Sequence, residues 1–162
     1  MQVHRSMPVP QPPHRRCRWT RVLAARARQV LAIDPAALQP EVLALPSVVH
    51  LRQKAEEAIL TMEPHGVREG ACDLVVCDAN LDALLICREL LMPMAPLLAP
   101  GAGLVLTLKL PRRCSAGRVA AIASDCEVLL RPAFDAVRVE HLFANTGNER
   151  TLLAHRRAQQ AA

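Results

Sequence analysis

Aromatic residues are scarce in this chain of 162 residues, which contains two phenylalanines, one tryptophan and no tyrosine. The chain therefore offers almost no aromatic side chains on which nucleic-acid bases could stack, and its core must pack from aliphatic side chains. The six cysteines form no C-x-x-C pair, so neither a disulfide framework nor a metal site is expected, and they are interpreted as small buried residues. Pro93, Pro96 and Pro100 interrupt the longest apolar run, so a membrane-spanning helix is not expected either.

Lysine is almost as rare as the aromatic residues. Of the 20 basic residues only Lys54 and Lys109 are lysines, so arginine is the usual cation of this chain and a lysine needs an explanation. Unlike a guanidinium, a partly buried ammonium can change its proton affinity, as a catalytic cation must. Lys109 also closes an apolar run, 103–110, which indicates that it stands at the end of a buried strand.

The bulk properties indicate one globular domain with a partner of negative charge. The chain is 51% hydrophobic with a mean hydropathy of +0.14, and 162 residues suffice for a single core. A formal charge of +5 is suited to binding a polyanion such as RNA. A high arginine content can equally reflect the composition of the genome, so the charge is only weak evidence.

Both ends of the chain are expected to be extended tails. Residues 1–17 are rich in proline, and residues 158–162 follow the last patterned segment. The first 33 residues hold seven arginines and no acid, so residues 1–15 resemble an organelle-targeting segment. The expected compartment is the cytoplasm, or an organelle such as a chloroplast or mitochondrion if residues 1–15 act as a targeting segment.

Between the tails, helical and strand patterns alternate. Helices are predicted at 19–28, from Asp34 to about Leu45, at 54–62, at 81–98 with a bend near Pro93, and at 116–130; strands are predicted at 29–33, 48–51, 73–77, 103–109, 134–143 and 151–155. The last two strands flank a turn-rich insert, 144–148, and form a hairpin. This order predicts an open α/β sheet, mostly parallel, with one antiparallel strand near the C-terminus.

Polar residues stand at the carboxyl ends of three predicted strands. Asp34, Asp78 and Lys109 can therefore meet at one edge of the sheet, where such folds bind ligands. If the hairpin lies beside the Lys109 strand, Glu149 can reach the ammonium, raise its pKa and fix its position. Each residue also has a purely structural interpretation, since both aspartates could cap helices, Lys109 could extend into water and Glu149 could be a solvated turn residue.

Five short segments, taken together, resemble a known family. They are Asp34-Pro35, Val75 to Asn80, Leu97 to Gly103, Thr107 to Lys109 and Asn148 to Thr151, and their order is that of FtsJ-like RNA 2'-O-methyltransferases. The resemblance covers about residues 18–156. Each segment is modest alone, and the combination of order, spacing and strand-end placement is fairly specific.

The resemblance implies a Rossmann-like methyltransferase fold and transfer of a methyl group from S-adenosylmethionine to a ribose hydroxyl of RNA, with ribosomal RNA the expected partner. It implies catalytic roles for Asp78, Lys109 and Glu149. It further implies that the cofactor is contacted by Asp34, Trp19, Glu56 and Asp78, with Glu56 standing in for an acid near the third strand of the family.

The amino end departs from the family pattern. Arginines at positions 15, 16 and 18 stand where the family has a glycine-rich cofactor loop, and neither the first, central strand nor the first catalytic lysine is recognisable. Loss of that strand should leave its neighbours without a partner. The chain is therefore either an N-terminally incomplete enzyme or a degenerate relative that binds RNA or protein without catalysis. A nicotinamide-dependent oxidoreductase lacks support, because no G-x-G-x-x-G follows any strand.

Overall fold

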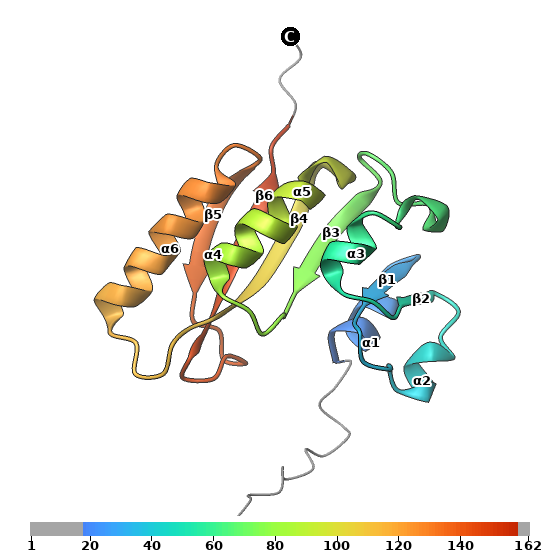
Figure 1. The fold of residues 1–162 in the computed structure, drawn as a ribbon, viewed down its shortest axis with the longest axis horizontal. Helices are drawn as coiled ribbons and strands as arrows, with labels where there is room; N and C mark the ends of the chain where they lie inside the picture. Colours follow the sequence, from blue (N-terminus) through green and yellow to red (C-terminus); the bar gives the residue numbers. More distant parts are fainter. Residues whose placement is uncertain (1–17, 159–162) are drawn as a thin grey trace, which may run out of the picture. The chain divides into compact units, whose positions relative to one another are not determined.

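The computed structural model describes residues 18–158. The two predicted tails, with the proposed targeting segment and the arginines at 15 and 16, lie outside the described residues apart from position 158. The chain divides into two compact units, residues 1–54 and 55–162, and each is described by itself (Figure 1). A single methyltransferase domain over residues 18–157 stays a prediction.

The first unit contains a small parallel sheet. Strand β1 (Val30–Ile33) pairs with β2 (Val48–Leu51), residue for residue from Val30 opposite Val48 to Ile33 opposite Leu51. Helix α1 (Arg18–Ala24) precedes the sheet and helix α2 (Pro40–Leu43) connects its strands. Ala32, Leu38 and Val42 form its small buried core. Both strands were predicted to within a residue, whereas α1 ends earlier than the predicted helix.

The helix predicted to begin at Asp34 does not form there. Asp34 Oδ1 accepts a hydrogen bond from Ala36 N at 2.8 Å, which makes a local turn, and α2 begins only at Pro40. The physical reason is Pro40, which disfavours helical backbone in the residue before it. Gln39 accordingly has an extended conformation, with φ −62° and ψ 140°, so residues 35–39 are too few for a stable helix.

The second unit is built on a four-stranded sheet in the order β3-β4-β6-β5. Strand β3 (Cys72–Cys77) pairs in parallel with β4 (Leu98–Lys109), while β6 (Glu149–Arg156) lies antiparallel between β4 and β5 (Phe134–Glu140). The prediction of a mostly parallel open sheet with one antiparallel strand and a C-terminal hairpin is confirmed. The carboxyl ends of β3, β4 and β5 consequently lie at one edge, where β6 begins.

Helices cover one face of this sheet (Figure 1). Helix α6 (Ala116–Leu130) was predicted with the observed bounds. The long apolar helix predicted at 81–98 consists of α4 (Ala83–Ile86), a π-helical turn, η3 (Cys87–Leu91), α5 (Met92–Met94) and a 3-10 turn, η4 (Ala95–Leu97). Pro93 has no N–H to bond the carbonyl of Glu89, which accounts for the interruption of the helix in this region.

The core of the second unit lies between these helices and the sheet. Leu104, Leu106 and Leu108 alternate along β4 and are each at most 1% exposed. They pack in one cluster with Ile86 and Leu130 of the helices. The remaining short elements, α3 (Ala55–Ile59) and the 3-10 turn η2 (Glu63–His65), precede β3. This packing fixes the ends of β3 and β4.

Each of the two sheets has edge strands that pair on one side only among residues 18–158. Strand β3 is an edge strand of the four-stranded sheet, and β1 is an edge strand of the two-stranded one. Among the described residues, no strand pairs with the second edge of either. That loss of the first strand leaves two neighbouring strands without a partner stays a prediction.

Candidate active site

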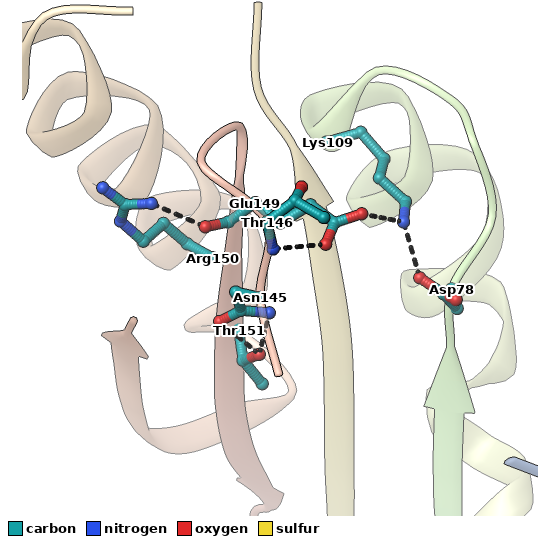
Figure 2. A network of polar contacts seen from close by, with 7 residues as sticks. All are labelled: Asp78, Lys109, Asn145, Thr146, Glu149, Arg150 and Thr151. Atoms are coloured by element: carbon teal, nitrogen blue, oxygen red, sulfur yellow. Dashed lines mark hydrogen bonds and ion pairs between the residues drawn. The ribbon is translucent and has the colours of Figure 1, made fainter. Parts of the chain in front are cut away.

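Three strand ends bring an ammonium group between two carboxylates. Lys109 Nζ donates hydrogen bonds to Asp78 Oδ1 and to Glu149 Oε1, each at 2.7 Å (Figure 2). The side chains are partly buried, with exposed fractions of 22% for Lys109, 20% for Glu149 and 44% for Asp78. The structure thus brings together all three residues to which the family resemblance gives catalytic roles.

The backbone explains why these residues meet. Lys109 is the last residue of β4, and Asp78 directly follows the parallel neighbour β3. Glu149 is the first residue of β6 and stands opposite Lys109 in the antiparallel register. A cross-strand pair at this position places the two side chains within reach of each other.

The charges of the cluster stabilise one another. Partial burial by itself lowers the pKa of Lys109, but the hydrogen bonds to Asp78 and Glu149 outweigh it, so the pKa lies above its usual value. The bond from Lys109, followed by the Thr146 N–H, holds the pKa of Glu149 below its usual value. Lys109 is therefore a cation at neutral pH and cannot serve as a general base.

A hydrogen-bonded turn holds Glu149 in place. Thr146 N donates to Glu149 Oε2 at 3.0 Å, and Glu149 N donates to Thr146 O at 3.0 Å. Asn145 also bonds the Thr151 hydroxyl, with Nδ2 3.1 Å from Oγ1, and Figure 2 shows this turn beside the ammonium. Sequence reasoning predicted a hairpin loop here but gave none of these residues a role, although an Asn-rich turn next to a candidate acid is a usable signal.

The ends of β4 and β6 are joined directly as well. Leu110 N donates to Asn148 O at 2.8 Å, so the loop after Lys109 is tied to the loop before Glu149. The Arg150 guanidinium donates from Nη1 to the backbone oxygen of Glu149 at 2.6 Å. Both contacts restrict the positions of Lys109 and Glu149.

Of the four residues predicted to contact the cofactor, Asp78 belongs to this cluster, and the other three are described separately. Asp34 follows β1 and Trp19 lies on α1, 43% exposed, both in the first unit. His50 Nε2 lies 3.0 Å from Asp34 O, which fixes the turn after β1. Glu56 lies in the first turn of α3 and is exposed. Their cofactor roles stay predictions.

A hollow of the second unit lies at the opposite edge of the sheet. It has a volume of about 330 Å³ and is lined by residues that include Pro96, Leu98 and Arg156, at the start of β4 and the end of β6. The Lys109 cluster instead lies at the carboxyl edge, where open α/β sheets bind ligands. We therefore place the candidate site on the cluster and not in the hollow.

Residues 18–158 contain no group of three or more metal-ligating side chains. None of the helices formed by these residues has the length and apolar character needed to cross a membrane.

Among the described residues, one N–H of Lys109 has no partner and is left for a substrate. An ammonium carries three N–H groups, and two of those of Lys109 are bonded to carboxylates. The third can donate to a hydroxyl oxygen that approaches the carboxyl edge of the sheet. Such a bond stabilises negative charge on that oxygen, and the adjacent carboxylates can accept its proton.

Sequence comparison identifies no relative, since no protein-family model matches the chain and no curated protein does so. Comparison of structures shows the fold. The chain is similar to the 16S rRNA (adenine(1408)-N(1))-methyltransferase of Catenulisporales acidiphilia, in a single-residue variant with cosubstrate SAM, at a TM-score of 0.54 and 16% identity over 90% of this chain and 84% of that one.

Two further structures extend the comparison. A proposed rRNA methylase from Clostridium thermocellum has a TM-score of 0.55 and 10% identity over 88% of this chain and 82% of its own. A proposed hemolysin from Streptococcus thermophilus has a TM-score of 0.57 and 17% identity over 86% and 55%. Several similar structures are longer, and the chain spans 42% to 60% of three of them. The chain therefore has the open α/β fold of Rossmann-like methyltransferases.

Proposed function

We propose that this protein is an S-adenosylmethionine-dependent methyltransferase that modifies a ribose 2'-hydroxyl of RNA, with ribosomal RNA as the expected substrate. The observation that carries the proposal is the Lys109 ammonium, held at 2.7 Å from both Asp78 and Glu149 at the carboxyl edge of the sheet. The methyltransferase fold, the rRNA methyltransferases among its structural neighbours and the net charge of +5 support it.

In this proposal Lys109 orients and polarises the attacking hydroxyl. Its third N–H donates to the ribose oxygen and stabilises the negative charge that develops there. Asp78 is the more exposed of the two carboxylates, so we assign it the hydroxyl proton. Glu149, held by the Thr146 N–H, keeps the ammonium charged and in position. S-adenosylmethionine, when bound, supplies an electrophilic methyl group.

The described residues fit this cofactor in part. A carboxylate after the second strand of the fold can accept hydrogen bonds from ribose hydroxyls. Asp34, which directly follows β1, corresponds to this carboxylate. Its Oδ2 would accept the ribose hydroxyl, because Oδ1 already accepts a hydrogen bond from Ala36 N. By contrast, the sequence has no glycine before Gly66, so no glycine turn precedes α1 to allow close backbone approach. The ribose end of the cofactor has a candidate acceptor, and the glycine loop has no counterpart.

A methyl-transfer assay with matched lysine variants tests the catalytic assignment. The chain is incubated with labelled S-adenosylmethionine and an RNA transcript, and Lys109→Met is compared with Lys54→Met. Loss of the polarising cation should reduce the rate by roughly 100-fold or more, whereas Lys54 has no role in the proposed mechanism and its variant should keep the wild-type rate. Equal rates in the two variants would refute the role of Lys109.

A second candidate is a module that binds RNA or a protein without catalysis. It is favoured by the edges of β1 and β3, which pair with no strand among residues 18–158, and by the lack of glycine in residues 14–18. Calorimetry with S-adenosylmethionine separates the two candidates. Micromolar binding of the cofactor would contradict a degenerate site, and RNA binding without cofactor binding would contradict the enzyme.

A further inference from the structure

One aromatic side chain of the chain is completely exposed. Phe143 has a relative exposure of 108%, whereas Phe134, the other phenylalanine, is 1% exposed in the core. Exposing a ring of this size forgoes roughly 1.5–3 kcal/mol of burial, so a soluble domain gains nothing from it in isolation. In a chain with three aromatic residues, the position of this ring calls for a functional explanation.

The ring is carried by an ordered turn. Leu142 N donates to Asn145 Oδ1 at 2.8 Å, and Asn145 N donates to Leu142 O at 2.9 Å, which closes a turn with Phe143 at its tip. Asn145 is anchored in turn to the hydroxyl of Thr151, which is 4% exposed on β6. The backbone under the ring is thus held by the same strand that begins at Glu149.

This turn lies at the edge of the sheet that carries the Lys109 cluster. Strand β5 runs parallel to β4 and ends at Glu140, opposite Thr151, three residues before Phe143. At no more than roughly 3.6 Å per residue, the Phe143 backbone stays within about 11 Å of that strand end. A nucleotide whose ribose reaches Lys109 would thus approach the same edge of the sheet as the turn that carries Phe143.

Positive charge accompanies the ring. Arg112 and Arg113 follow Lys109 in the turn after β4, and both are exposed. No hydrogen bond or ion pair joins them to other described residues. Arg113 has φ 58°, a left-handed conformation that is costly for a residue with a side chain and is found more often at functional sites. The bond from Leu110 N to Asn148 O links this turn to the loop that carries Phe143.

We propose that Phe143, Arg112 and Arg113 form a binding platform for an unpaired RNA segment, in which the ring stacks on a base next to the modified nucleotide and the guanidinium groups contact the adjoining phosphates. The proposal rests on the proposed function and narrows its substrate class to single-stranded or looped RNA. A base inside a duplex has no exposed face to offer the ring. The two unpaired arginines favour a polyanion over an apolar protein surface.

A binding experiment tests the platform without requiring catalysis. A single-stranded oligoribonucleotide containing 2-aminopurine reports stacking through its fluorescence, and the full chain is titrated into it. Phe143→Ala should bind about 5- to 160-fold more weakly, as removal of one stacking contact predicts, while Phe143→Trp should bind about as tightly as the wild type. Val128→Ala is the control, because Val128 is also exposed, at 61%, on the half of α6 that leads away from this edge.

The arginines are tested by salt dependence. Replacing both Arg112 and Arg113 by glutamine should reduce the slope of log affinity against log salt by about 1.4, since each phosphate contact on a single strand contributes about 0.7. An unchanged slope would overturn their assignment.

Three results would overturn the platform as a whole. The first is that Phe143→Ala and Val128→Ala bind RNA with equal affinity, and the second is that the wild type binds a duplex of the same sequence as tightly as the single strand. The third is that Phe143→Ala loses self-association while its RNA affinity is unchanged, which would show that the ring contacts protein. The proposed function would be refuted by a different result. Methyl transfer that depends on Lys109 but not on Phe143 would refute only the platform, and Phe143-dependent RNA binding without methyl transfer would refute only the enzyme.

Discussion

Replacing Lys109 by methionine should destabilise the protein by about 2 kcal/mol at pH 7. Methionine keeps the apolar length of the side chain, so the change removes mainly the charge and the two hydrogen bonds to Asp78 and Glu149. Asp78 is 44% exposed and regains water when its partner is lost, at a cost of roughly 0–1 kcal/mol. Glu149 is 20% exposed and loses a charged partner it cannot fully replace, at a cost of about 1–3 kcal/mol.

The loss should shrink in acid. The pKa of Glu149 is held below its usual value, so its contribution is fully present above its unfolded pKa, about 4.3, and disappears as the pH falls through the lower folded value. The pKa of Lys109 is raised, so its contribution is complete below about pH 10.4 and declines only above that. The difference between wild type and variant should therefore be constant from about pH 5 to 9.

Urea unfolding followed by circular dichroism measures this difference from pH 7 down to pH 3.5. Lys54→Met is the matched control, because Lys54 is the other lysine and is exposed. It should change the free energy of unfolding by less than about 0.5 kcal/mol. A loss in Lys109→Met that equals the control at pH 7, or one that stays constant down to pH 3.5, would refute the reasoning.

Two further predictions concern the scaffold under the site, and both are checked by thermal unfolding against Leu60→Ala, whose side chain is 85% exposed. Leu106→Ala removes a side chain that is 0% exposed on β4 and should cost about 2–5 kcal/mol; a loss below 1 kcal/mol would contradict its place in the core. Asp82→Ala removes the N-cap of α4, which accepts from Leu84 N and Leu85 N, and should cost about 0.5–2 kcal/mol; a melting temperature equal to that of the control would argue against the cap.

Much of the fold was predictable because its elements carry local signals. The apolar strand before Lys109 and the helix at 116–130 have unambiguous periodicity; the helix has its predicted bounds, and the strand ends at Lys109 as predicted. The errors have local causes as well. At Asp34 the signal for a helix start was outweighed by Pro40, which forces extended backbone in the residue before it. The length of β4, which begins at Leu98, was underestimated because Pro100 and Gly101 resemble a turn.

The candidate site was predictable to a different degree for each residue. Asp78 directly follows β3, and Lys109 is the last residue of the parallel neighbour β4. The order of the strands and the positions of their ends therefore sufficed to place both residues at one edge of the sheet. The pairing with Glu149 required the register of β4 and β6, which joins residues 40 positions apart. The turn through Asn145 and Thr146 was recognisable as a turn, but not as the support of Glu149, because its bonds depend on that register.

The sequence by itself determined that an ammonium would stand at the end of a buried strand, since a single lysine closes an aliphatic run in a chain whose other cations are nearly all arginines. Only the tertiary structure decided that two carboxylates meet that ammonium at 2.7 Å and that the one exposed phenylalanine lies at the same edge. Strand register and turn closure set these positions, and both arise from packing between segments distant in the chain.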